Sequence, residues 1–254
     1  MAFIDFHVHI DFYDNPWKII NAYEDRGIYA LFVTNLPEIY EKHLANYGNF
    51  KYVKLALGYH PEIISEYPLN EECFYKNLRY TNYIGEVGLD FTGCNELDKK
   101  KQVQYFKSIC EIVKGKSKIL SIHSRKAENI VLQILKDNDI EFAVFHWYSG
   151  SISLIKSIID NGYYFSVNYG MLNSKSGRNI LSHIPKNKIL FETDGPFIRK
   201  DKKVVSPDDI PQIYKEFNEF YGINDFGDIV YYNFKKLLHD RMIKETKSKF
   251  LIEN

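Results

Sequence analysis

Six residues of types that bind divalent metal ions lie at the ends of short apolar runs spread over the whole chain. They are His7, His9, Glu86, His123, His146 and Asp194. Imidazole and carboxylate ligands without a thiolate are typical of sites for Zn²⁺, Mn²⁺ or a similar divalent ion. Such ions activate water and polarise ester or phosphoryl oxygens, so the pattern predicts a metal-dependent hydrolase.

The spacing of His7 and His9 places both imidazoles on one side of the first apolar run, residues 3–6. Residues i and i+2 of an extended strand point to the same face, so both rings can approach one ion. Asp5 lies on that face too, one step deeper. A lone His-x-His pair would be weak evidence, because a buried histidine is more often a hydrogen-bonded core residue. Six suitable residues at successive run ends are much harder to explain by chance, and we interpret them as a metal site.

Eight apolar or β-branched runs would position these residues. They are residues 3–6, 29–33, 52–57, 83–84, 119–122, 142–145, 163–167 and 189–191. Most runs are followed by a polar turn and then by a stretch with helical spacing, which predicts parallel strands joined by crossover helices. Eight repeats favour a closed (β/α)₈ TIM barrel over an open doubly wound sheet. In such a barrel the C-terminal ends of all strands meet at one rim, where active sites form.

The composition fits one globular barrel domain over residues 1–254, with 45% hydrophobic and 26% charged residues. Lys plus Arg equals Asp plus Glu at 33 each, which argues against a protein that coats nucleic acid but not against a local phosphate site. The three cysteines show no CxxC spacing, which favours free thiols in a reducing compartment. Neither a signal-peptide pattern nor a membrane-spanning apolar stretch is present in the sequence, so we expect a cytoplasmic protein without a membrane partner.

The motifs around the candidate ligands resemble those of TatD-type metal-dependent deoxyribonucleases, within the amidohydrolase superfamily. The resemblance runs from Phe3 to about Leu238 and is carried by FIDFHVHID, GYHP, GEVGLD, IHSRKA, FHWYSG and ETDGP, in this order. It implies a (β/α)₈ fold, two divalent ions (Zn²⁺, Mg²⁺ or Mn²⁺) and hydrolysis of phosphodiester bonds. The implied substrate is DNA, as single strands or strand ends that are cleaved exonucleolytically.

The resemblance also divides the six candidate ligands between the ions. The first ion takes His7, His9 and Asp194, the second takes His123 and His146, and Glu86 is shared. His60, which follows the third run, is similar to a family histidine near the scissile phosphate. Asp194 is expected to orient the attacking water or accept its proton, so the expected catalytic residues are Asp194, His60 and Glu86.

Further residues are expected to contact the phosphates or bases of the DNA strand. They are His60, Arg125, Tyr148, Arg199 and Lys200. Arg125 could clamp a phosphate with paired donors or form a plain surface salt bridge. Arg199 and Lys200 begin a basic segment, residues 199–207, that could guide DNA or be a solvated loop. Tyr148 and its neighbour Trp147 could stack bases or be packing residues.

Two departures from the family pattern leave the substrate open. Trp147 and Tyr148 follow His146 where the family usually has Cys-Phe, and a short basic segment replaces Arg-Gly-x-x-Asn-x-Pro after Asp194. One alternative is a small-molecule amidohydrolase or lactonase, although many of these carry a metal-bridging modified lysine where this chain has Glu86. PHP phosphoesterases also begin with His-x-His but end with Asp-x-His. A third alternative is a subunit of a bacterial defence or repair complex that depends on protein partners.

Overall fold

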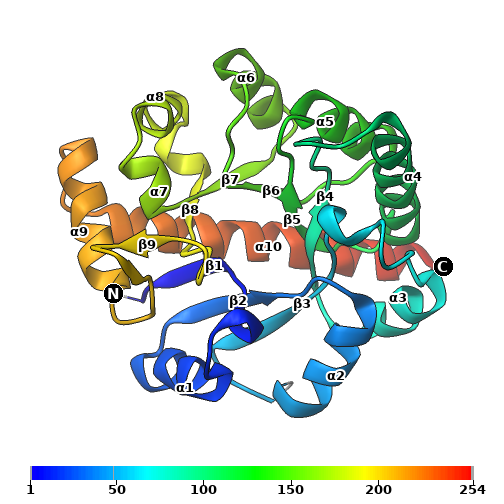
Figure 1. Ribbon diagram of the computed structural model, residues 1–254, viewed down its shortest axis with the longest axis horizontal. Coiled ribbons are helices and arrows are strands. Elements are labelled where there is room, and N and C mark those ends of the chain that lie inside the picture. The colour runs from blue at the N-terminus through cyan, green and yellow to red at the C-terminus, as the bar shows by residue number, and fades with distance from the viewer. Residues whose placement is uncertain (1, 48, 253–254) are drawn as a thin grey trace.

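Eight parallel strands form the centre of the molecule and follow one another around the sheet in chain order (Figure 1). The computed structural model describes residues 2–47 and 49–252. The strands are β1 (Ile4–Val8), β2 (Tyr29–Val33), β3 (Val53–Tyr59), β4 (Tyr83–Gly88), β5 (Ile119–His123), β6 (Ala143–His146), β7 (Tyr164–Val167) and β8 (Ile189–Phe191). The (β/α)₈ prediction is therefore confirmed.

Helices connect the strands and surround them (Figure 1). They are α1 (Pro16–Arg26), α2 (Pro37–Tyr47), α3 (Glu71–Asn77), α4 (Glu96–Val113), α5 (Glu128–Asp137), α6 (Ile152–Asp160), α7 (Tyr169–Leu172), α8 (Lys175–His183), α9 (Ile210–Tyr221) and α10 (Phe226–Ile252). Short 3-10 turns lie at η1 (Ile10–Phe12), η2 (Pro61–Ile63), η3 (Leu78–Tyr80) and η4 (Lys186–Lys188). None of the helices in the described part of the chain is long and apolar enough to cross a bilayer. The three cysteines are free thiols, as predicted.

Two backbone hydrogen bonds join the first strand to the segment that follows the last. The Asp194 N–H donates to the His7 carbonyl at 2.9 Å, and the His9 N–H donates to the Gly195 carbonyl at 2.8 Å. These bonds bring β1 and the end of β8 together and complete the ring. The closure of the barrel therefore places Asp194 beside His7 and His9.

Helix α10 lies across the N-terminal ends of the strands (Figure 1). The Phe234 ring packs against Tyr29, the first residue of β2, with centroids 4.6 Å apart. The Asn233 amide donates to the carbonyl of Ile189, the first residue of β8, at 2.8 Å. The helix thus covers one end of the barrel, and the C-terminal ends of the strands at the opposite end carry the candidate site.

Two glycines allow strands to approach closely beneath that site. A Cβ on Gly58 of β3 would lie 1.7 Å from the Thr34 carbonyl oxygen, so only glycine fits there. Gly88 of β4 has φ +143°, and a Cβ there would lie 1.9 Å from the His123 carbonyl oxygen. The missing side chains let β3 approach the segment after β2 at Gly58 and let β4 approach β5 at Gly88.

The segment after β8 departs from the expectation of an exposed loop. Residues Arg199–Lys200 form β9 and pair antiparallel with β10, Lys203–Val204. Ile198 and Val205 flank this hairpin and are buried, with exposed fractions of 4% and 1%. The basic side chains are therefore carried on a short hairpin that is anchored at both ends.

Candidate metal centre

The structure brings all six candidate ligands together at the C-terminal end of the barrel. Two lie within strands, two end strands, and two follow strands. They are His7 in β1, Glu86 in β4, His123 at the end of β5, His146 at the end of β6, His9 after β1 and Asp194 after β8. A cavity of about 620 Å³ opens above them.

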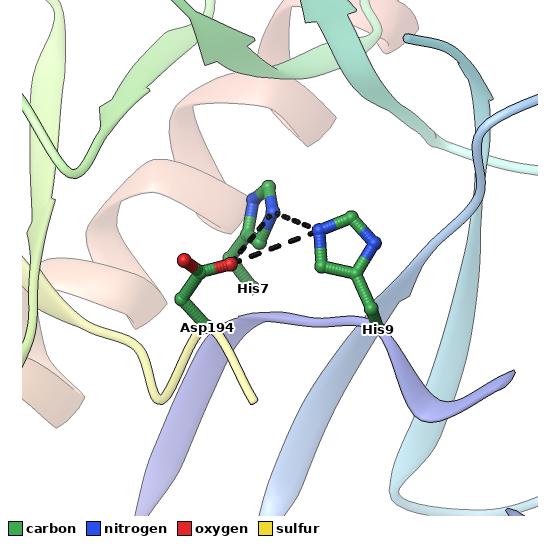
Figure 2. A group of neighbouring side chains, drawn as sticks. All are labelled: His7, His9 and Asp194. Atoms are coloured by element: carbon green, nitrogen blue, oxygen red, sulfur yellow. Dashed lines mark hydrogen bonds and ion pairs between the residues drawn. The ribbon is translucent and has the colours of Figure 1, made fainter. Parts of the chain in front are cut away.

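The first group consists of His7, His9 and Asp194, which point toward one another (Figure 2). The Nε2 atoms of the two histidines are 3.2 Å apart, and each lies 3.7 Å from Asp194 Oδ1. Glu86 Oε2 lies 3.4 Å from His7 Nε2 and 3.2 Å from His9 Nε2. Ligand atoms about 2.1 Å from one tetrahedral ion stand about 3.4 Å from one another. The separations in this group fit one divalent ion.

The second group surrounds the other oxygen of Glu86. Glu86 Oε1 lies 2.5 Å from His123 Nδ1 and 2.8 Å from His146 Nε2. The two imidazole nitrogens are 3.2 Å apart. The carboxylate of Glu86 thus presents one oxygen to each group.

His60 approaches the same carboxylate through its Nε2 atom. His60 Nε2 lies 3.4 Å from Glu86 Oε2, while its Nδ1 accepts a hydrogen bond from the Glu62 N–H at 3.2 Å. A neutral imidazole that accepts at Nδ1 carries its proton on Nε2. His60 therefore offers a hydrogen-bond donor to the centre and not a free lone pair for a metal ion. Its distance alone would also allow it to be a ligand, since its ligand atom lies within 4.8 Å of those of Glu86 and His123.

The charges of the centre are strongly coupled. Burial alone would raise the pKa of Glu86, but the imidazoles around it hold that pKa well below 4.5. Burial alone would lower the pKa of His123, but Glu86 and Asp90 raise it to about 9. The pKa of His146 lies well above 6.5, because Glu86 and Glu192 outweigh the effect of burial. The carboxylates thus attract positive charge to the centre, as protons or as metal ions.

Two residues at the site have a left-handed backbone although neither is glycine. Asp194 has φ +48° and Trp147 has φ +36°. This conformation is uncommon for residues with side chains and clusters at functional sites. Backbone contacts hold both residues, since Asp194 N–H donates to His7 and Trp147 N–H donates to Glu192 Oε1 at 3.0 Å.

Sequence reasoning missed the polar partners behind three of the imidazoles. The pairs are His123 Nε2 with Asp90 Oδ2 at 2.9 Å, His146 Nδ1 with Glu192 Oε1 at 3.5 Å, and His7 Nδ1 with Ser121 Oγ at 2.8 Å. Hydrogen-bonded partners fix the ring orientation of ligating histidines, as Asp90 and Ser121 can do here, whereas Glu192 faces His146 through its charge without a hydrogen bond to Nδ1. Asp90 and Glu192 stand inside the motifs GEVGLD and ETDGP, so the motifs contained a clue to them.

Asp5 supports the first group from below. Its carboxylate accepts hydrogen bonds from the Thr193 N–H at 2.8 Å, the Thr193 hydroxyl at 2.6 Å and the Tyr23 hydroxyl at 2.5 Å. Thr193 directly precedes Asp194, so Asp5 ties that segment to β1. The side chain that the sequence placed one step deeper than His7 therefore binds the neighbouring backbone.

The expected substrate contacts divide into two classes. His60 and Arg125 line the cavity, and Arg125 is exposed. Tyr148 is only 1% exposed and its hydroxyl donates to the Ser151 carbonyl at 2.8 Å. This corrects the expectation for Tyr148, because a buried ring has no free face to stack on a base.

The basic pair on the hairpin stands apart from the described residues that line the cavity. The Lys200 ammonium pairs with Glu216 and lies 4.6 Å from the centroid of the Tyr169 ring. The Arg199 guanidinium donates to the Lys202 carbonyl at 3.1 Å. Any role of Arg199 and Lys200 in guiding DNA would thus act at a distance from the centre.

The order and placement of the motifs agree with a known family. A family model described as TatD related DNase matches residues 4–239. The chain belongs to this family. As a TatD-family member it is a metal-dependent hydrolase, which confirms the predicted class of enzyme.

This TatD-family chain is similar to proteins from Methanocaldococcus jannaschii, human and Escherichia coli. An uncharacterized metal-dependent hydrolase from Methanocaldococcus jannaschii is 26% identical over 198 residues, which cover 75% of this chain and 77% of the relative. Human deoxyribonuclease TATDN3 is 29% identical over 125 residues, 48% of this chain and 45% of that protein. The crystal structure of the TatD homolog YjjV from Escherichia coli K12 matches with a TM-score of 0.81 at 20% identity, covering 92% of this chain and 97% of that one. That likeness supports the TIM-barrel fold.

Proposed function

We propose that this TatD-family protein hydrolyses phosphodiester bonds in DNA with two divalent ions that share Glu86. The observation that carries the proposal is the division of the Glu86 carboxylate, whose two oxygens face two separate groups of ligands. The names of relatives support the substrate, because TATDN3 from human and Tat-D from Schizosaccharomyces pombe are both named deoxyribonucleases.

The donor set suits two similar ions. His7, His9 and Asp194 would hold one, His123 and His146 the other, with Glu86 between them. Ions bound there would lower the pKa of a water molecule and neutralise developing charge on phosphoryl oxygens. Zn²⁺, Mg²⁺ and Mn²⁺ all accept imidazole and carboxylate ligands to different degrees, and availability decides between them.

Three side chains of the chain would act on the substrate directly. Asp194 orients the attacking water and accepts its proton, because its carboxylate belongs to the first group and also lines the cavity. His60 donates a hydrogen bond from Nε2–H to a non-bridging phosphate oxygen, in agreement with the hydrogen bond that its Nδ1 accepts from the Glu62 N–H. Arg125 presents paired donors to the same phosphate from the cavity wall. Attack in line with a leaving 3′ oxygen would release nucleotides from a strand end.

Cleavage of end-labelled strands tests this function. Purified protein supplied with Mg²⁺, Mn²⁺ or Zn²⁺ should release mononucleotides from single strands labelled at the 3′ or the 5′ end, and EDTA should stop the reaction. Comparison of the two labels gives the direction of digestion. A parallel screen of lactones and cyclic amides tests the small-molecule alternative, which would be favoured if these are hydrolysed and DNA is not.

A matched pair of variants tests the shared ligand. Glu86→Ala should abolish cleavage and reduce the bound metal measured by elemental analysis, because both ions lose a ligand. Glu111→Ala is the control, since Glu111 is an exposed carboxylate on α4. Full activity of Glu86→Ala would rule the mechanism out.

A further inference from the structure

Two phenylalanines stand exposed at the cavity, directly beside the first group of ligands. Phe12 in η1 is 50% exposed and Phe197 after β8 is 55% exposed, and both line the cavity. Their ring centroids are 5.6 Å apart. Both rings meet the His9 imidazole edge to face, at 5.7 Å for Phe12 and 5.1 Å for Phe197. Two exposed aromatic side chains thus lie in direct contact with His9, a candidate metal ligand.

The backbone ties both rings to the candidate ligands. The Phe12 N–H donates to the His9 carbonyl at 3.1 Å, and the Phe197 N–H donates to the Asp194 carbonyl at 3.0 Å. Ile10, two residues before Phe12, and Ile198, directly after Phe197, are buried and anchor the two segments in the core. The backbones that carry the two rings are therefore fixed relative to His9 and Asp194.

A third aromatic ring lies in the cavity wall next to the second group. Trp147 follows His146, is 38% exposed and lines the cavity. Its backbone N–H donates to Glu192 Oε1, so the backbone of Trp147 is fixed next to His146. The cavity thus combines polar ligands at its base with aromatic faces beside both groups.

Aromatic faces beside a phosphate-binding centre fit one chemical class of ligand. An unpaired nucleobase stacks on aromatic side chains whatever its identity, because every base has a π-face. Phenylalanine offers no hydrogen-bonding group that could distinguish one base from another. A paired base inside a duplex keeps its faces covered by its neighbours, so only a single strand or a frayed end could use these rings.

We infer that Phe12 and Phe197 form a stacking platform for the unpaired nucleobase that flanks the phosphate held at the metal centre. This inference rests on the proposed function and assigns specific residues to the recognition of the single strand that the family resemblance implies. The platform selects unpaired over paired DNA and does not discriminate among the four bases. Tyr148, which the sequence offered either as a stacking or as a packing residue, is buried, so we assign the contact with the base to the Phe12–Phe197 pair.

Binding of a fluorescent strand tests the platform without turnover. The probe is a short single strand with phosphorothioate linkages and 2-aminopurine as its terminal base, added to the metal-loaded protein. Stacking should quench the probe. The double variant Phe12→Leu/Phe197→Leu keeps apolar bulk against His9 but removes the aromatic faces. We expect it to weaken binding about 5- to 150-fold, which corresponds to the range measured for one stacked base.

Two further variants control for folding and for general loss of aromatic surface. Phe12→Tyr/Phe197→Tyr keeps both faces and should bind like the wild type. Tyr232→Ala removes a 67% exposed ring on α10, at the other end of the barrel, and should also leave binding unchanged. All variants should retain the wild-type metal content by elemental analysis. Equal binding and quenching by the leucine variant and the wild type would overturn the platform.

Removal of the base from the substrate separates this inference from the proposed function. An abasic nucleotide beside the scissile phosphate should slow the wild type and leave the leucine variant unaffected by the missing base. If the base removal slows both proteins equally, the platform is refuted while DNA cleavage stands. If the wild type cleaves no DNA, the proposed function fails, and the quenching experiment still decides the platform. The platform is supported if the wild type quenches the probe and the leucine variant does not. It is refuted if the wild type does not quench the probe.

Discussion

Replacement of Glu192 by glutamine should weaken metal binding on the His146 side without unfolding the protein. Glu192 is fully buried. Its Oε1 accepts from the Trp147 N–H at 3.0 Å and the Asn168 amide at 2.9 Å and lies 3.5 Å from His146 Nδ1. Its Oε2 accepts from the Ser166 hydroxyl. Glutamine with its oxygen in the Oε1 position keeps the first two bonds, and its amide can donate to the Ser166 oxygen. The variant therefore loses mainly the negative charge that faces His146.

Glu192→Gln is expected to change metal affinity, whereas Glu192→Ala is expected to change the stability of the fold. Loss of a carboxylate behind a ligating histidine typically reduces metal affinity about 10- to 100-fold. Competition with a chelating dye should therefore show one equivalent of metal weakened by that factor and the other nearly unchanged. Glu192→Ala instead removes the acceptor of three buried donors, those of Trp147, Asn168 and Ser166. At about 1–3 kcal/mol each, their loss approaches the whole stability of a domain, about 5–15 kcal/mol.

Thermal unfolding in EDTA distinguishes these effects. The glutamine variant should melt close to the wild type, whereas the alanine variant should be strongly destabilised or fail to fold. Glu216→Gln is the matched control, because Glu216 is a partly exposed carboxylate that pairs with Lys200 outside the cavity. Unchanged affinity for both equivalents in Glu192→Gln, or an alanine variant as stable as the wild type, would refute this account of Glu192.

Three further predictions follow from the geometry. The metal-free protein should carry a proton on His123 at pH 7, because Glu86 and Asp90 outweigh burial and raise its pKa to about 9. Calorimetry in two buffers should then show proton release on metal binding, with affinity that rises as the pH is raised from 7 towards 9. Gly88→Ala should destabilise the protein by about 2–6 kcal/mol in urea unfolding, since strain at φ +143° adds to the clash with a backbone oxygen. Tyr148→Phe should cost about 1 kcal/mol of stability through a lost hydrogen bond and leave DNA affinity unchanged, so a marked loss of affinity would contradict its buried position.

The strands and the candidate ligands could be predicted because both depend on local pattern. The runs at residues 29–33 and 189–191 match β2 and β8 exactly in their bounds, since a strand buried on both faces is a continuous apolar stretch. Knowledge that parallel strands end at one rim then places His123 and His146 in one site without further information. His7 is already inside β1, so the end of that run was placed too early, but the alternation of faces that pairs His7 with His9 does not depend on the exact end.

The partners behind the imidazoles depend on register, which a local pattern does not contain. Gly88 of β4 pairs with His123 of β5, and this pairing sets Asp90, two residues further on, beside the imidazole. The register between these strands shifts between Ile84 and Val87, so counting residues from the strand starts would misplace Asp90. Glu192 likewise reaches His146 because its own N–H donates to Val167 of the neighbouring strand.

The aromatic contacts show the same limit more strongly. Trp147 and Tyr148 are neighbours, yet one lines the cavity and the other is buried, because the left-handed backbone of Trp147 turns the chain between them. Phe12 and Phe197 lie far apart in sequence, and neither stands in a position that a motif marks. They become neighbours only through the hydrogen bonds that join the end of β1 to the segment after β8. Since those same bonds bring Asp194 to His7 and His9, the closure that assembles the candidate metal centre also assembles the proposed platform.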